Sequence, residues 1–301
     1  MYRVGVIGTG VVGSAVAILL QDKGHKVTGL YSKTGISAAN LAGRLGCTTF
    51  ANPEQVLGYA EVIFLTTPDS ELDYIVSLLA ESGLVKEKHH FFHMSGALPA
   101  EVLVPLREQG GNICSLHPLQ SFAGIEQALV NLPGSFFSVQ GDAAAMKTAY
   151  RLVADLEGVS FDIRSEDKPL YHLGAVVASN YFVALIHFVL QIYNSIGISE
   201  DEAIGALLPL IKGTLSNIEE IGTVKALTGP VARGDFGIIE AHLRAISKLP
   251  HSYIDLYKTL GRYTVQIALE KGSIDETQTN LLLKLFSEGD GSNAEQQDYH
   301  I

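Results

Sequence analysis

Short apolar runs and longer amphipathic stretches alternate along the first half of the chain. Runs such as YRVGVIG at 2–8, AEVIFLT at 60–66 and NICSLH at 112–117 end in turns, and longer helical patterns follow several of them. Continuous apolar runs of this length are typical of buried parallel strands, and their alternation with helices indicates βαβ units. We therefore predict an α/β fold with a doubly wound, mostly parallel sheet.

The pattern changes near residue 165, where strand-like runs give way to helical periodicity. Glycine and proline residues at 197, 222, 230, 250 and 272 divide this half into segments. The predicted helices cover 168–197, 199–221, 234–247, 250–271 and 275–287. The expected parts are an α/β domain over 1–165, an all-α domain over 166–288 and a polar, disordered tail over 289–301.

Charge and composition exclude several classes of function. The 301 residues include 21 basic and 32 acidic side chains, which give a net charge of −11 and disfavour a general nucleic-acid partner. Cys47 and Cys114 lack the spacing of a metal site, and no carboxylate or cysteine completes a ligand set near the histidines at 89, 90 and 93. The start, MYRVGVIGTG, does not resemble a signal peptide, so we expect a cytoplasmic protein.

A glycine motif follows the first predicted strand and opens an apolar helix. Gly8, Gly10 and Gly13 form G-x-G-x-x-G, in which the glycines permit a tight turn, close approach to a pyrophosphate and close helix–strand packing. The helix N-terminus offers free N–H groups to the phosphates. This arrangement predicts a Rossmann-type dinucleotide-binding domain.

The end of the second predicted strand bears on the choice of nucleotide. A carboxylate there usually holds the ribose 2′-hydroxyl of NAD. This chain has Ser32 and Lys33 instead, which suit a 2′-phosphate and favour NADP(H); the alternative is that Lys33 is only a solvated loop lysine.

Further residues are placed near the nicotinamide by their position after strands, because ligands of such sheets bind beyond the carboxyl ends of the strands. The Thr-Thr-Pro-Asp segment also fits a helix cap. The predicted cofactor-binding set is Gly8, Thr9, Gly10, Val11, Val12, Gly13, Ser32, Lys33, Thr66, Thr67, Pro68, Ser95 and Gly96, and His117 is placed beside the substrate.

The stretch KPLYHLGAVVASNYFVAL at 168–185 is long and apolar enough to raise the question of a membrane span. His172, Asn180 and His187 interrupt it, so we interpret it as a central helix of the second half and expect no membrane partner. His172 and Ser179 share a helical face with Asn180 beside it, and we predict that these three residues are catalytic. The alternative is a satisfied core histidine and a helix-contact pair.

A second polar segment, LTGPVARGD at 227–235, precedes a predicted helix. Thr228 and Arg233 could bind a substrate carboxylate, Arg233 through a bidentate fork. The alternative is a loop in which Arg233 pairs with Asp235 or Glu240.

The N-terminal glycine-motif domain, the mid-chain Thr-Pro-Asp and the helical second half together resemble the 6-phosphogluconate-dehydrogenase-like superfamily. Its members include ketopantoate, pyrroline-5-carboxylate and 3-hydroxyacid reductases or dehydrogenases. More narrowly, SLHPLQSF, YHLGAVVASNY and LTGPVARGD resemble the motifs of a bacterial branch of NADP oxidoreductases with a C-terminal domain of unassigned function. The resemblance implies a homodimer formed through the helical domain.

One departure limits what the resemblance implies about chemistry. Ketopantoate reductases and 3-hydroxyacid dehydrogenases carry a lysine four residues before the helix asparagine, where this chain has Val176 before Asn180. The expected activity is NADPH-dependent reduction of a small 2-oxo acid of the ketopantoate type at the domain interface, with His172 or His117 as the proton donor. The alternatives are an imine reductase of the pyrroline-carboxylate type and a non-catalytic NADP(H)-binding regulator.

Overall fold

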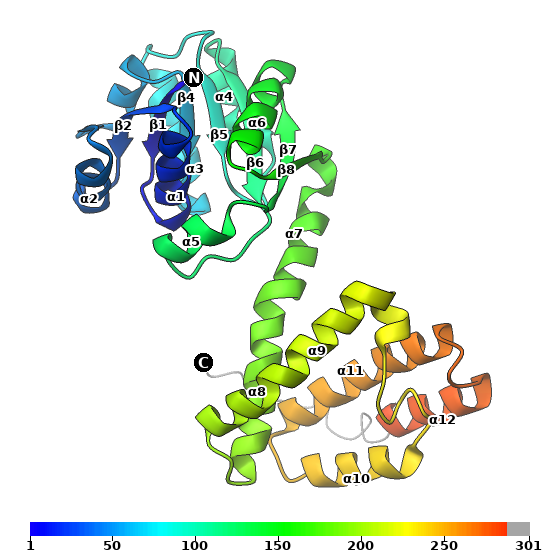
Figure 1. Ribbon diagram of the computed structural model, residues 1–301. Coiled ribbons are helices and arrows are strands. Elements are labelled where there is room, and N and C mark those ends of the chain that lie inside the picture. The colour runs from blue at the N-terminus through cyan, green and yellow to red at the C-terminus, as the bar shows by residue number, and fades with distance from the viewer. Residues whose placement is uncertain (288–301) are drawn as a thin grey trace, which may run out of the picture. The chain divides into compact units, whose positions relative to one another are not determined.

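The computed structural model describes residues 1–287, and the chain divides into two compact units (Figure 1). Unit 1 comprises Met1–Phe182 and unit 2 begins at Val183. The sequence suggested a boundary at 165, but the first turns of the central helix pack against the sheet and so belong to unit 1. The predicted tail, 289–301, lies outside the described residues.

An eight-stranded sheet forms the centre of unit 1, and its strand order is β3-β2-β1-β4-β5-β6-β7-β8. All neighbouring pairs are parallel except β6 and β7, which run antiparallel. This confirms the predicted fold class. The strands are β1 Arg3–Ile7, β2 Lys26–Tyr31, β3 Thr48–Thr49, β4 Val62–Leu65, β5 His90–His93, β6 Asn112–Pro118, β7 Phe136–Gly141 and β8 Val159–Asp162.

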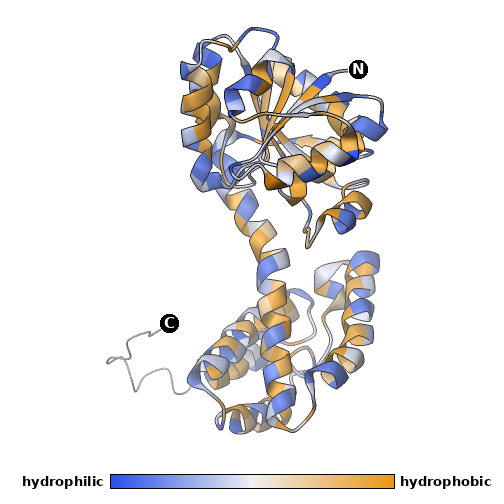
Figure 2. Cartoon of the chain, turned by 90° about the vertical axis from the view of Figure 1, so that its left-hand side faces the viewer, coloured by the Kyte–Doolittle hydropathy of each residue, from blue (hydrophilic) through white to orange (hydrophobic). Residues whose placement is uncertain are grey.

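Helices cover both faces of this sheet, because alternate strand residues are apolar on each side. On one face Val6, Phe64 and Phe92 pack under four α-helices. These are α1 Val11–Asp22, α2 Ile36–Leu45, α5 Ile125–Asn131 and α6 Ala143–Asp155. On the other face Ile63 and Phe91 pack under a second set of helices. These are η1 Pro53–Gly58, α3 Asp69–Glu81, η2 Ala100–Leu103 and α4 Val104–Glu108. Many strand residues are accordingly coloured as hydrophobic in Figure 2.

The rest of the described chain is helical, as the sequence predicted. A short turn, η3 Ser165–Asp167, precedes the helices α7 Lys168–Val176, η4 Val177–Tyr181, α8 Phe182–Ser195, α9 Glu200–Ala226, α10 Phe236–Ile246, α11 His251–Glu270 and α12 Glu276–Ser287. Gly197 and Gly272 adopt φ of +85° and +69° at helix ends, a conformation that favours glycine. Two details differ from the prediction: η4 is a π-helical turn inside the predicted helix, and α9 continues past a kink at Gly222.

The continuous helical stretch Ser165–Ser195 is long and apolar enough to cross a membrane, with a hydropathy of 1.9, and 11% of its most apolar window is buried. Length and composition alone are weak evidence for a span, since the core helix of a soluble protein passes the same test. The expectation that this helix does not enter a membrane stays a prediction.

Candidate active site

The glycine loop between β1 and α1 is shaped as its motif requires. Gly8 has φ of +103°, and a Cβ there would lie 2.6 Å from the backbone of Thr66 and Thr67. A Cβ on Gly13 would lie 2.3 Å from the Gly8 carbonyl oxygen. Gly10, by contrast, has no neighbouring atom within 4 Å of such a Cβ, which leaves the open approach that a pyrophosphate needs. The Thr66 hydroxyl donates to the Gly8 carbonyl at 2.6 Å and joins this loop to the end of β4.

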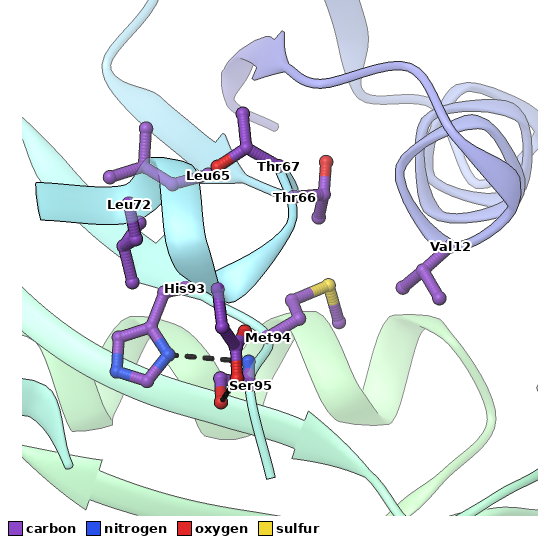
Figure 3. A pocket seen from close by; sticks show the side chains of 9 residues that line it. Val12, Leu65, Thr66, Thr67, Leu72, His93, Met94 and Ser95 are labelled. Atoms are coloured by element: carbon purple, nitrogen blue, oxygen red, sulfur yellow. Dashed lines mark hydrogen bonds between the residues drawn. The ribbon is translucent and has the colours of Figure 1, made fainter. Parts of the chain in front are cut away.

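A cavity of about 110 Å³ lies beside this loop at the carboxyl ends of β4 and β5 (Figure 3). It is lined by Val12, Leu65, Thr66, Thr67, Asp69, Leu72, His93, Met94 and Ser95. The Thr67 hydroxyl oxygen is buried and has no hydrogen-bond partner among the described residues. A buried, unpartnered hydroxyl is costly and fits a cavity that receives a polar ligand group.

The loop after β2 contains the residues predicted to read the nucleotide ribose. The Ser32 hydroxyl accepts a hydrogen bond from the Ala38 N–H at 3.2 Å, so it caps α2. Lys33 donates to the Glu71 carboxylate at 2.9 Å from an exposed position. Lys33 therefore has a competing anion within reach, and the preference for NADP(H) stays a prediction.

Ser95 follows β5, and its hydroxyl is engaged within the protein. It donates to Asp69 Oδ2 at 2.6 Å and accepts from the N–H groups of Ala97 and Leu98. The His93 ring is also fully bonded: its Nδ1 accepts from the Ser95 N–H, and its Nε2 lies 3.1 Å from the Pro99 carbonyl. Ser95 and His93 thus shape the wall of the cavity. Within residues 1–287, no group of three or more histidine, cysteine, aspartate or glutamate residues could hold a metal ion.

His117 and His172 meet over Gly96, although they come from β6 and α7. Their ring centroids are 6.4 Å apart and their planes stand at 78°. A Cβ on Gly96 would lie 2.6 Å from His172 Cδ2 and 2.8 Å from His117 Nε2, so only glycine leaves room for both rings. The structure therefore brings together three residues that the sequence analysis selected separately.

Two further residues of this cluster were not assigned a role from the sequence. The Tyr171 hydroxyl lies 2.9 Å from His117 Nδ1. Lys168 is fully buried, and its ammonium donates to the Ser115 hydroxyl and, at 3.2 Å, to the Ser95 carbonyl. The signal in the sequence was the spacing: Lys168, Tyr171 and His172 stand at i, i+3 and i+4 and share one helical face.

Burial and the nearby ammonium keep the inner histidines uncharged. Burial, followed by the charges of Lys168 and His172, lowers the pKa of His117 to about 4. Burial and Lys168 lower the pKa of His93 to about 3. Burial also lowers the pKa of Lys168 to about 8, which leaves it mostly protonated at neutral pH. The cluster therefore presents neutral imidazoles beside one buried cation.

The other predicted site residues lie further from this cluster or in the other unit. Ser179 and Asn180 belong to η4, and seven residues of helix place Ser179 roughly 10 Å along the axis from His172. Thr228 and Arg233 belong to unit 2 and are exposed. Arg233 Nη2 lies 3.8 Å from Asp235 Oδ2, which is the ion pair that the sequence analysis gave as the alternative. The roles assigned to these four residues stay predictions.

The fold and the glycine loop define a Rossmann-like protein, and comparison with protein families agrees. Residues 1–118 match a Rossmann-like domain, and residues 135–264 match a domain of unknown function, DUF2520. The two matches follow one another along the chain, in agreement with the resemblance that the sequence predicted. No curated protein matches the chain.

Solved structures share this fold over most of the chain. A candidate NADP oxidoreductase from Bacteroides fragilis is 23% identical with a TM-score of 0.73, and the match covers 88% of this chain and 98% of that one. Protein TM1727 from Thermotoga maritima is 28% identical with a TM-score of 0.70, covering 89% and 99%. An imine reductase from Streptomyces aurantiacus is 18% identical with a TM-score of 0.59, covering 96% and 94%.

Proposed function

We propose that this protein is an NADPH-dependent reductase that acts on a small substrate with a polarised C=O or C=N bond. The observation that carries the proposal is the His117–His172 pair over Gly96, next to the loop that bounds the dinucleotide cavity. A reductase needs a hydride donor and a proton source at one place. At the carboxyl ends of the strands, the cavity would hold the hydride donor and the histidine pair would provide the proton.

The residues around the cavity fit a dinucleotide. The diphosphate would lie in the open space at Gly10 and accept hydrogen bonds from the N–H groups at the start of α1. The unpartnered Thr67 hydroxyl would bind an adjoining polar group of the dinucleotide. Lys33 would exchange Glu71 for the 2′-phosphate. When bound, NADPH would supply the hydride.

The two histidines would have different tasks. Neither ring nitrogen of His172 has a hydrogen-bond partner within residues 1–287, so His172 is free to donate a proton to the developing alkoxide or amine. His117 is held neutral, and with the Tyr171 hydroxyl donating to Nδ1 it would carry its proton on Nε2. The Nε2–H group then donates a hydrogen bond to the substrate and leaves the proton transfer to His172.

Our leading substrate class is a small 2-oxo acid. Ser179 and Asn180 would orient the carbonyl, while Thr228 and Arg233 would hold the carboxylate. The second candidate is a cyclic imine. It is supported by structural matches to pyrroline carboxylate reductases from Plasmodium falciparum and Streptococcus pyogenes, which cover 95% and 91% of this chain, and by Val176 at the position where other reductases have a lysine.

Oxidation of NADPH measured across a matched panel of 2-oxo acids and cyclic imines tests this proposal. Turnover of either class supports a reductase, and the ratio of kcat/KM values between the classes identifies the substrate type. NADPH binding measured by calorimetry on the same sample is the companion experiment. Tight binding without turnover of any panel member would instead indicate a non-catalytic NADP(H)-binding regulator.

A further inference from the structure

The fully buried ammonium of Lys168 has no role in the function proposed above. Lys168 opens α7, yet its Nζ donates to the Ser115 hydroxyl in the middle of β6 and to the Ser95 carbonyl after β5. Burying a charge without compensation costs folding free energy. The two hydrogen bonds offset part of that cost, and they indicate that the buried ammonium has a specific role.

The contacts of Lys168 determine where its helical neighbours lie. Lys168, Tyr171 and His172 stand on one face of α7. Ser115 and His117 are two residues apart on β6 and therefore point to the same side of the sheet. Tying Lys168 to Ser115 consequently sets Tyr171 against His117 one helical turn later, where their hydroxyl and Nδ1 are 2.9 Å apart.

The ionisable groups around the cluster favour a protonated Lys168 and uncharged inner histidines. His117 faces Lys168, His172 and Tyr171 from α7, while Lys168 also faces His93 from β5. Asp69 at the start of α3 and Glu101 on η2 carry negative charges that stabilise the ammonium. The cation therefore persists near neutral pH and disfavours a second positive charge on either inner histidine.

We propose that Lys168 is a positioning residue of this site: its ammonium fixes the first turn of α7 on strands β5 and β6, and its charge adds to the burial that keeps His117 uncharged and able to donate a hydrogen bond. This inference deepens the proposed function and rests on it only for the purpose of the neutral histidine. Lys168 is fully buried and its ammonium bonds to Ser115 and Ser95, so we assign its effect to His117 and Tyr171.

The decisive experiment follows the His117 ring signals by NMR against pH in the unaltered protein and in Lys168→Met. Removal of the charge should raise the His117 pKa by about 1 unit, at the lower end of the effect of one neighbouring charge. The control Lys147→Met removes an exposed lysine from α6 of the same unit and should leave the His117 pKa unchanged. An unchanged His117 pKa in folded Lys168→Met would overturn the proposal.

The unaltered protein provides a second measurement in case Lys168→Met does not fold. Deprotonation of Lys168 should produce a second step in the His117 ring signals near pH 8, and a flat response between pH 7 and 9.5 would contradict the proposal. Ser115→Ala removes one contact and keeps the charge, so the His117 pKa should stay within a few tenths of its original value.

Enzyme assays separate this inference from the proposed function. With an active substrate, the acid limb of the kcat/KM profile should move upward in Lys168→Met together with the His117 pKa, a shift that a purely structural residue would not cause. If no oxo acid or imine is reduced, the proposed function fails, while the His117 titration still decides the role of Lys168.

Discussion

At the residue scale, His117 and His172 compete for the role of proton donor, and their environments separate them. Burial and nearby positive charge hold His117 neutral, whereas His172 is half-buried with both ring nitrogens free of partners in the described chain. His172→Ala should therefore lower turnover about 10²–10⁴-fold, the usual contribution of a positioned general acid. NADPH affinity should stay nearly intact, because the phosphates would be held by the glycine loop at 8–13.

The same measurements on His117→Ala complete the test. Loss of its N–H donor should lower kcat, but the assignment of His172 is wrong if only His117→Ala abolishes turnover. If His172→Ala lowers the melting temperature and spares turnover in the folded fraction, His172 is a packing residue. Calorimetry with NADPH on both variants shows whether the nucleotide site is preserved.

Lys33 carries the predicted preference between nucleotides. NADPH should bind at least about tenfold more tightly than NADH, a difference of roughly 1.4 kcal/mol. Lys33→Asp should erase this difference by setting a carboxylate against the 2′-phosphate. Fluorescence titration with both nucleotides measures the two affinities.

Glu71 supplies the control for that prediction, because it pairs with Lys33 across the loop. Glu71→Gln frees Lys33 and should leave NADPH binding equal or slightly tighter, since an exposed ion pair contributes about 0–1 kcal/mol. Equal affinities of the unaltered protein for NADPH and NADH would remove the argument from Ser32 and Lys33.

At the scale of elements, the loop after β5 determines whether β6 and α7 can bring their histidines together. Gly96→Ala adds a Cβ within 3 Å of both rings, which must then move. We expect kcat to fall about 10²-fold, since a displacement of 1 Å can cost that much. Gly43→Ala on α2 meets no atom within 4 Å and serves as the control. Full activity of Gly96→Ala would place the reaction elsewhere.

Strands β5 and β6 and the turn before them also predict an acid-sensitive fold. Burial lowers the pKa values of His89 and His117 to about 4 and that of His93 to about 3, below the unfolded value near 6.5. Their stabilising contribution is present above pH 6.5 and is lost as pH falls toward 4, because the unfolded chain then binds more protons. The free energy of unfolding should fall by on the order of 1 kcal/mol per histidine between pH 7 and 5.

Urea unfolding at the two pH values measures this effect. His89→Asn preserves an acceptor for the Lys86 N–H and lies away from the candidate site, so it should remove one histidine's share of the pH dependence. A stability that is equal at pH 5 and 7 would show that these histidines are not held neutral in the folded protein.

How much the sequence could predict depends on whether the interactions are local. The glycine punctuation at 197 and 272 and the apolar strands are local signals, and the structure confirms the elements that they delimit. Gly222 marks a kink inside α9 and does not end it. The contacts of Lys168 with Ser95 and Ser115 span 73 and 53 residues, so no window of sequence contains them. Strand β8 carries a weaker local signal, because it is short, lies at the sheet edge and has only half-buried or exposed residues.

At the scale of the whole molecule, the apolar stretch around the junction of α7 and α8 remains to be explained. Leu170, Leu173, Val177, Tyr181 and Val183 are each about half or more exposed in the isolated chain. Soluble proteins rarely leave such a surface uncovered, and only 11% of the most apolar window of this helix is buried. We predict that a second copy of the chain covers it and that the protein is a homodimer through its helical half.

Sedimentation at micromolar concentration tests the dimer, and one substitution locates its interface. Val183→Asp places a charge on the exposed helix and should shift the protein toward monomer, because burying an unpaired carboxylate in an apolar interface costs several kcal/mol. Lys147→Glu changes charge on the exposed surface of α6 and should leave the dimer intact. A monomer of the unaltered protein in detergent-free buffer contradicts the prediction.

Preparations that remain dispersed only with lipid or detergent would instead identify the helix as a membrane segment, and the apolar surface would then face lipid.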